Sequence, residues 1–393
     1  MPLSSPQWPP CARRSRRPSR ASLRSPPGSC TSRPPCDAAI DCTSSGVAAG
    51  GVRFLVAEAS DDGADADAAR LAGEEEHDAE AFGRLVPALD AGQLPAEAMA
   101  AQVTRLRGGL ALGVAVHHAV ADGRSVWMFL EAWAAACRGD VDAAVAAPPA
   151  FDRAAVRLPG AEELARTSLR KYAPNLPMAA VAGHLIRPNL SRRTFTITAQ
   201  DMRRLKHRIA DLSPATATAA TPPSSFVAVA ALAWVSFVHA KHPAGIASAD
   251  DEVYLFFFAD CRARFDPPPG DRYFGTCISG CLARAAAWDL LAENGLSVAA
   301  AAVAAEVRRA TEDPLAGLVN LAGSTRLPAY EATDFGWGPP GRTELVTMNH
   351  DGQVVVVAGK KGGDGGAGGV QGPVSLHPAH MDAYKSHFLS YFG

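Results

Sequence analysis

The stretch VAVHHAVADGRSVWMFLEAW, residues 114–133, decides how the rest of the chain is interpreted. It overlaps residues 108–120, which are apolar almost throughout, as expected of a strand buried on both faces. Residues 125–137 then have the spacing of an amphipathic helix, with Gly139 as a stop signal. His118 and Asp122 therefore lie in a turn between strand and helix, where a rigidly held side chain can face a cleft.

The composition is that of a globular protein with room for two domains. The chain has 393 residues, of which 48% are hydrophobic and 20% charged. Its net charge of -2 provides no basic field for nucleic acid or a membrane surface, and no apolar stretch approaches the roughly 20 residues that span a bilayer. The eight cysteines form no Cys-x-x-Cys pair, so we expect no zinc site and a reducing, cytosolic environment.

The chain divides into four regions. Residues 1–45 are rich in Arg, Pro and Ser and are expected to be disordered, with a transit peptide as a second interpretation. Residues 46–165 are expected to form a first half-domain, residues 166–190 a crossover segment, and residues 191–393 a second domain. Both halves mix strand and helix patterns without a dinucleotide-binding glycine fingerprint, which predicts an α/β protein with mixed sheets flanked by helices.

Several elements outside the opening stretch have clear patterns. We expect a strand at residues 52–59, a strand through Phe195 and Ile197, a following helix capped by Thr198, and buried segments within 221–240 (helix) and 252–260 (strand). Residues 297–311 and the segment after Pro378 are expected to be helical. Residues 342–377 are expected to form a strand, an Asp-Gly turn, a second strand, a glycine-rich loop and a third strand.

The spacing of His118 and Asp122 does not by itself identify a site. His207 and Asp211 have the same spacing, but they lie in a charged amphipathic pattern and are expected to be a surface pair. His118 follows a buried strand, and Gly123 after Asp122 allows a tight turn into the helix. Three other interpretations stay open: a hydrogen-bonded core histidine, a metal-ligating pair of His117 and His118, and an Asp122 that only caps the helix.

Direct acyl transfer is the chemistry that fits this histidine. An imidazole can take a proton at neutral pH from an acceptor hydroxyl as that oxygen attacks a carbonyl, and can return the proton to a leaving thiolate. The chain has no Gly-x-Ser-x-Gly nucleophile elbow, and this reaction needs none. Asp122 would then anchor the turn through a buried ion pair with an arginine.

A second motif, DFGWG, occupies residues 334–338. Two glycines flank Trp337 and let the backbone turn sharply. Asp-Phe-Gly also occurs in kinases, but this chain has no glycine-rich loop and no His-Arg-Asp. One interpretation is a structural loop that packs Phe335 and Trp337; another has the indole N–H donating toward an oxyanion.

The motifs HHAVADG, FFADCRARF, YFGTC and DFGWG, in this order, resemble those of the plant BAHD acyl-CoA-dependent acyltransferases. The resemblance runs from about residue 51 to the end. It implies a two-domain fold similar to chloramphenicol acetyltransferase, with an active-site channel between the domains. It also implies an acyl-CoA co-substrate, a small-molecule acceptor, no metal and no prosthetic group.

The resemblance implies roles for individual residues. His118 corresponds to the general base, and Asp122 to an aspartate that faces away from the site and pairs with Arg262. Structural roles are implied for Gly123, Asp334, Phe335, Gly336 and Gly338, and an approach of Trp337 to the reacting carbonyl. Contacts with substrate or CoA are expected for Ser225, Phe226, Arg124, Tyr273 and Phe274.

The segment YFGTC is similar to the Tyr-Phe-Gly-Asn-Cys of family members that acylate sugars of flavonoid and other phenolic glycosides, with Thr276 in place of the Asn. Malonyl-CoA or hydroxycinnamoyl-CoA is therefore the expected donor, and Arg124 a candidate partner for a malonyl carboxylate. Before the strand at 52–59 the Arg/Pro/Ser-rich segment stands where the family has an additional strand and helices. A missing element would expose a sheet edge and apolar surface.

The leading hypothesis is a monomeric, cytosolic O-acyltransferase of phenolic glycosides, with no nucleic-acid or membrane partner. A condensation-domain-like acyltransferase of peptide synthesis shares the His-His-x-x-x-Asp-Gly pattern and is the first alternative. A truncated, inactive family member is the second.

Overall fold

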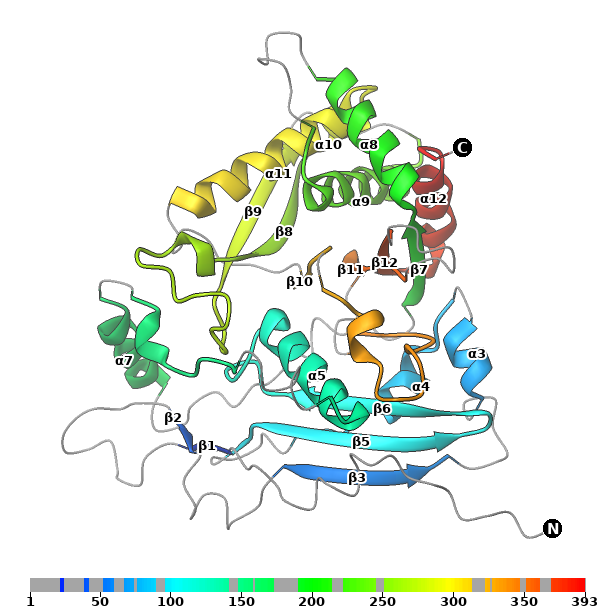
Figure 1. Cartoon of the computed structure of the whole chain (residues 1–393). Coiled ribbons are helices and arrows are strands. Elements are labelled where there is room, and N and C mark those ends of the chain that lie inside the picture. The colour runs from blue at the N-terminus through cyan, green and yellow to red at the C-terminus, as the bar shows by residue number, and fades with distance from the viewer. Residues whose placement is uncertain are drawn as a thin grey trace.

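The structure is a computed structural model, shown in Figure 1, which describes fifteen stretches of the chain. These are residues 22–24, 39–41, 52–59, 67–73, 76–89, 96–140, 148–157, 160–172, 190–213, 222–244, 251–312, 322–325, 327–346, 351–360 and 369–392. Within these residues, no helix is both long and apolar enough to cross a membrane.

The N-terminal half is built on a three-stranded sheet in the order β3-β5-β6. It consists of β3 (Arg53–Glu58), β5 (Met99–Leu106) and β6 (Gly109–Val116), with β5 parallel to β3 and antiparallel to β6. The helix α5 (Gly123–Arg138) follows β6 and lies between this sheet and the C-terminal half (Figure 1). The Asp122 side chain caps its first turn, and Gly139, with φ 85°, ends it in the left-handed conformation that glycine favours.

The C-terminal half packs helices around a buried central helix, α9 (Ser225–Lys241). This helix is rich in Ala and Val on every side, which fits a helix that is covered all round. Its neighbours are α8 (Ala199–Asp211), α11 (Gly295–Glu312) and α12 (Pro378–Leu389). Thr198 caps α8 as expected, and Met381, Tyr384 and Phe388 of α12 are buried.

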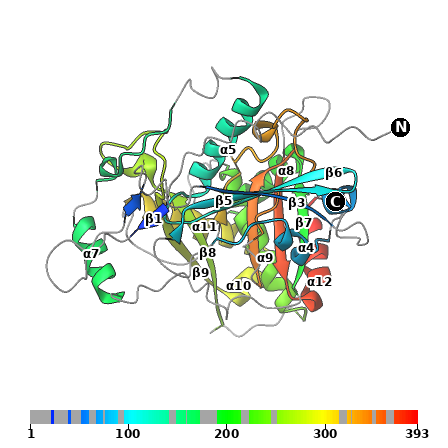
Figure 2. The same ribbon diagram turned by 90° about the horizontal axis from the view of Figure 1, so that it is seen from below.

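Two groups of strands complete the C-terminal half. One sheet has the order β10-β11-β12-β7 and comprises β7 (Ser191–Ile197), β10 (Ala322–Gly323), β11 (Gln353–Ala358) and β12 (Val370–Leu376). The other is the antiparallel pair β8 (Glu252–Asp260) and β9 (Ile278–Ala286), with α10 (Ala287–Leu291) after it. Seen from below, the β3-β5-β6 sheet runs across the strands β11, β12 and β7 (Figure 2).

Shorter elements lie within both halves and in the segment between them. They are α3 (Ala68–Gly73), α4 (Ala79–Arg84), β4 (Ala96–Glu97), α7 (Ala161–Tyr172), and the 3-10 helices η2 (Arg153–Ala155), η3 (Arg262–Arg264) and η4 (Glu331–Thr333). Trp127 of α5 packs in one apolar cluster with Ala329, Tyr330 and Val357. The helix that follows the His118 turn is therefore held by residues of the C-terminal half.

Three sequence expectations differ from the structure. The expected burial of residues 108–120 on both faces is wrong for β6, because the described residues leave Leu110 45% and Leu112 37% exposed. Residues 342–346 form no strand, and the Arg342 and Glu344 side chains pair with each other instead. Residues 347–350 lie outside the described part of the chain.

The third difference lies in the Arg/Pro/Ser-rich segment. Six of its residues form β1 (Ser22–Arg24) and β2 (Ala39–Asp41), which pair with each other, while β1 also pairs with β4. These six residues are in a sheet rather than disordered, and the rest of residues 1–45 lies outside the described chain. The predicted boundary between residues 165 and 166 falls inside α7.

Candidate active site

His118 lies in the turn between β6 and α5, together with its neighbour His117. The side chain of His118 is exposed at the wall of a large cavity. His117 is half-buried, and its Nδ1 accepts a hydrogen bond from the Ala119 N–H at 3.2 Å. Burial, together with the neighbouring His118, lowers the pKa of His117. The two rings thus differ in role: His117 helps to close the turn, and His118 is presented to the cavity.

Asp122 is buried behind the same turn and pairs with Arg262, as the resemblance implied. The Arg262 guanidinium places Nη2 3.0 Å from Oδ1 and Nη1 2.9 Å from Oδ2, and the two side chains are only 2% and 1% exposed. Burial opposes the charge of Arg262, but Asp122 and Asp260 raise its pKa. Asp122 also accepts from the N–H of Ser125, so it is both a helix cap and one member of a buried ion pair.

Ser125 completes this buried network, and no feature of the sequence identified it. Its Oγ donates to the Gly275 carbonyl at 2.9 Å and accepts from Arg262 at 3.1 Å and from the Gly275 N–H at 3.0 Å. The N–H of Cys277 donates to Asp122 Oδ2 at 3.0 Å. Segment 273–277, far away in sequence, is thus tied to the turn that carries His118.

Two residues of this segment are not placed as the expectation of substrate contact requires. Tyr273 is 2% exposed and packs between the guanidinium groups of Arg153 and Arg262, at 5.8 and 5.6 Å from its ring centre. Phe274 packs against Phe151 at 5.3 Å. Neither lines the cavity. Tyr273 instead contacts the two arginines that bind the turn of His118, Arg153 at the Val120 carbonyl and Arg262 at Asp122.

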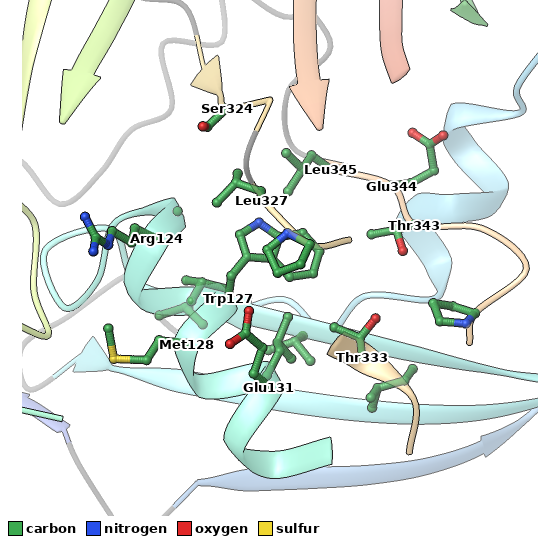
Figure 3. A pocket seen from close by; sticks show the side chains of 18 of the residues that line it. Arg124, Trp127, Met128, Glu131, Ser324, Leu327, Thr333, Thr343, Glu344 and Leu345 are labelled. Atoms are coloured by element: carbon green, nitrogen blue, oxygen red, sulfur yellow. The ribbon is translucent and has the colours of Figure 1, made fainter. Parts of the chain in front are cut away.

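The cavity has a volume of about 2330 Å³ and is lined by both halves of the chain. The side chains of Arg124, Trp127, Met128 and Glu131 face it from α5, and Ser324, Leu327, Thr333, Thr343, Glu344 and Leu345 face it from the C-terminal half (Figure 3). Ser225 and Phe226, expected near the CoA channel, also line it. Gly123 lines the cavity at the start of α5, without the positive φ that other glycines of the chain show.

Arg124 lines the cavity, but two carboxylates already bind it. Its Nη1 lies 3.1 Å from Asp260 and its Nη2 2.9 Å from Asp271. The sequence could not show this pairing, because Asp271 lies in a loop without periodicity. Arg124 is thus already paired in this structure, and its contact with a malonyl carboxylate stays a prediction.

Glu131, two turns further along α5, was not singled out from the sequence. Its carboxylate is half-buried in the cavity, on the same face of α5 as Trp127 and Met128 (Figure 3). Burial raises its pKa, and Arg272 partly opposes the shift. Glu131 is thus an acceptor of hydrogen bonds at the wall of the cavity.

The DFGWG loop packs on the far end of α5. Oδ1 of Asp334 accepts from the N–H groups of residues 336, 337 and 338 at 2.8, 3.1 and 2.9 Å, and Gly336 and Gly338 have φ of 102° and 92°. Phe335 packs edge-on against Trp133, with ring centres 5.2 Å apart. Nη1 of Arg138 donates to the Asp334 carbonyl.

The indole of Trp337 is 57% exposed in this loop. At a rise of about 1.5 Å per residue, roughly 16 Å of helix separates Asp122 from Trp133, against which the loop packs. The structure therefore does not bring Trp337 to the turn of His118, although both line the same long cavity. The expected approach of the indole to the reacting carbonyl is not supported, because the loop belongs to the opposite end of the helix.

No cluster of three or more His, Cys, Asp or Glu residues suited to a metal ion occurs within the described stretches.

Comparison with known proteins gives the family. The family model described as "Transferase family" matches residues 28–322. The chain belongs to the BAHD acyltransferases. It is thus an acyl-CoA-dependent acyltransferase that acts on small molecules.

Relatives in this BAHD family have defined names. The chain is 29% identical to phenolic glucoside malonyltransferase 2 of Arabidopsis thaliana, over 82% of this chain and 74% of the relative. It is 30% identical to malonyl-CoA:anthocyanidin 5-O-glucoside-6''-O-malonyltransferase of the same plant, over 82% and 75%. It is also 30% identical to phenolic glucoside malonyltransferase 1 of Nicotiana tabacum, over 65% and 60%.

Solved structures show the same fold. Vinorine synthase matches with a TM-score of 0.61 and 19% identity, over 91% of this chain and 80% of that one. TRI101 of F. sporotrichioides, complexed with coenzyme A and T-2, matches with a TM-score of 0.62 and 18% identity, over 98% and 91%. The two-domain BAHD fold expected from the motifs is confirmed.

Proposed function

We propose that this BAHD enzyme transfers a malonyl or hydroxycinnamoyl group from CoA to a sugar hydroxyl of a phenolic or flavonoid glycoside. The observation that carries the proposal is His118, presented to a cavity lined by both halves of a chain whose relatives are named as malonyltransferases of such glycosides. The YFGTC segment, which is similar to the motif of sugar-acylating family members, supports the same acceptor class.

In this mechanism His118 is the general base. Its imidazole takes the proton of the sugar hydroxyl while that oxygen attacks the thioester carbonyl. The C–O bond forms, the tetrahedral intermediate collapses, and the C–S bond breaks. The imidazolium then returns the proton to the CoA thiolate. Asp122 takes no part in proton transfer, since Arg262 and two N–H groups occupy its oxygens.

The cavity supports an acceptor that is part apolar and part polyol. Trp127, Met128 and Leu327 offer apolar surface to a phenolic ring. Glu131 offers a carboxylate that can accept hydrogen bonds from neighbouring sugar hydroxyls, and Thr333 and Thr343 add hydroxyl groups (Figure 3). A neutral glycoside suits such a wall, because burying the carboxylate without a donor is costly.

The test is a donor-by-acceptor panel with mass detection of the product. Purified full-length protein is assayed with malonyl-CoA, coumaroyl-CoA and acetyl-CoA against a phenolic glucoside, the corresponding aglycone and glucose. We expect product only with the glucoside, and a mass gain that matches the donor acyl group. His118→Ala should lower kcat about a thousandfold or more. Full turnover by this variant, or acylation of the aglycone alone, would contradict the proposal.

The proposal also places the enzyme in the cytosol as a monomer without a resident cofactor. The four cysteines that the structure describes, Cys137, Cys261, Cys277 and Cys281, are buried, and the last three are free thiols, which suits a reducing compartment. Burial raises the pKa of the Cys277 thiol to about 12, so this thiol is unsuited to act as a nucleophile.

A further inference from the structure

The imidazole of His118 makes no hydrogen bond to any described side chain or backbone group, so the direction of the ring depends on the backbone of its turn. Residues from other parts of the chain form hydrogen bonds with that backbone. The Asp122 N–H donates to the Gly275 carbonyl at 3.3 Å, and Arg153 Nη2 donates to the Val120 carbonyl at 3.1 Å. A base that must meet a hydroxyl in one geometry needs such a support.

The contact closest to the base comes from Thr276. Its Oγ1 donates to the carbonyl oxygen of His118 itself, at 2.6 Å. Cys277, the next residue, binds the carboxylate of Asp122 through its N–H at 3.0 Å. Two successive residues of one segment thus hold the two motif residues of the turn, His118 and Asp122.

The segment that carries Thr276 is itself fixed. Gly275 accepts hydrogen bonds from Arg262 and Ser125 through its carbonyl, and a side chain there would meet Arg153 Nη1 at 1.7 Å. The backbone at Gly275 therefore lies directly against the end of the Arg153 side chain. Thr276 is β-branched, with a restricted χ1, so its hydroxyl has few other directions to take.

We propose that Thr276 is a positioning residue for His118: its hydroxyl fixes the His118 carbonyl and thereby the direction of the imidazole. This inference rests on the proposed function, in which His118 is the base. It also assigns a role to residue 276, where this chain has Thr and the similar Tyr-Phe-Gly-Asn-Cys segment has Asn. An asparagine there also carries a donor, in its side-chain amide.

The experiment compares three variants at one position. Thr276→Val removes the hydroxyl and keeps the shape, Thr276→Ser keeps the hydroxyl, and Thr276→Asn replaces it with an amide donor. Thr276→Val should lower kcat about tenfold while KM for acyl-CoA and for the glucoside stays within about twofold, because binding surfaces are unchanged. Thr276→Ser should recover kcat to within about twofold, and Thr276→Asn should recover it in part.

Thr167→Val is the matched control. Thr167 is an exposed threonine of α7 whose hydroxyl donates to Glu163 at 3.4 Å, so its loss should leave kcat unchanged. Thermal melts of every variant show whether a low kcat comes from a destabilised fold; an unchanged Tm would leave a displaced His118 imidazole as the cause. Equal kcat for wild type and Thr276→Val, or a low kcat that Thr276→Ser does not recover, would overturn the inference. A fully active His118→Ala would instead overturn the proposed function.

Discussion

The guanidinium of Arg262 contacts both carboxylate oxygens of Asp122, with Nη2 3.0 Å from Oδ1 and Nη1 2.9 Å from Oδ2. The pair joins the start of α5 to η3, which follows β8, and thus one half of the chain to the other. Both groups are almost fully buried, so neither can be compensated by water if its partner is lost.

We therefore expect Asp122→Asn to lower the free energy of unfolding by about 2–5 kcal/mol, since it leaves the buried Arg262 with the partly exposed Asp260 as its remaining ion-pair partner. Urea denaturation of the purified variant measures this loss. Glu162→Gln, at the exposed end of an ion pair with Arg166 on α7, is the control and should change stability by less than about 0.5 kcal/mol. Equal stability of Asp122→Asn and wild type would contradict a structural role for the pair.

The DFGWG loop gives a second prediction. Asp334→Ala removes the oxygen that accepts three backbone N–H groups and should destabilise the enzyme by about 1–3 kcal/mol, seen as a lower Tm. Trp337→Ala should keep kcat within about twofold, because the exposed indole lies at the end of α5 away from His118. A hundredfold loss of kcat in Trp337→Ala with an unchanged Tm would instead place the indole at the reacting carbonyl.

Local signals accounted for much of the fold. The Thr198 cap, the glycine that ends α5 and the wholly apolar α9 each depend on a short stretch of sequence, so each could be predicted from it. β5 and β9 were missed. β5 alternates weakly and is interrupted by polar residues, and β9 contains small residues that suit helix and strand alike. The exposed face of β6 could not be predicted because an apolar strand pattern does not show which face is covered.

The candidate site, like the fold, could be predicted only in part. His118, Asp122 and Arg262 follow from motifs that lie beside strands, and the structure brings the last two together. The ion pair of Arg124 with Asp271 could not be predicted, because Asp271 lies in a loop that has no periodic pattern. Glu131 was missed because one glutamate on an amphipathic helix resembles any solvated residue until the cavity beside it is seen.

Glu131 gives a third prediction, which tests the acceptor side of the proposed function. Glu131→Gln keeps the shape of the side chain but weakens its capacity to accept hydrogen bonds from sugar hydroxyls. KM for a phenolic glucoside should rise about tenfold, while KM for acyl-CoA stays within about twofold. Initial rates with each substrate varied in turn measure both constants.

The control for Glu131 is a second carboxylate on the surface. Glu163→Gln on α7 removes an exposed carboxylate outside the cavity lining and should leave both constants unchanged. A rise of KM for acyl-CoA alone in Glu131→Gln would place this carboxylate on the donor side of the cavity instead.

The last prediction concerns acid stability and rests on His77, which is 7% exposed. Its Nε2 lies 2.8 Å from Thr194 Oγ1 and also contacts the Arg342 guanidinium, with Glu344 3.9 Å away. Burial, with Arg342 and Arg192 nearby, lowers the pKa of His77 to about 3. The folded chain therefore holds this imidazole neutral, whereas the unfolded chain binds a proton below about pH 6.5.

Because the unfolded state binds more protons between pH 6.5 and about 3, the contribution of His77 is complete above pH 6.5 and decreases as the pH falls through that window. Between pH 7 and 5 we expect it to remove about 2 kcal/mol from the free energy of unfolding. Urea titrations at the two pH values measure the loss. His77→Gln cannot titrate and should show a loss smaller by about that amount, while His207→Gln, at an exposed position of α8, should keep the wild-type dependence. An equal pH dependence in His77→Gln and wild type would mean that the imidazole is not held neutral between the two halves.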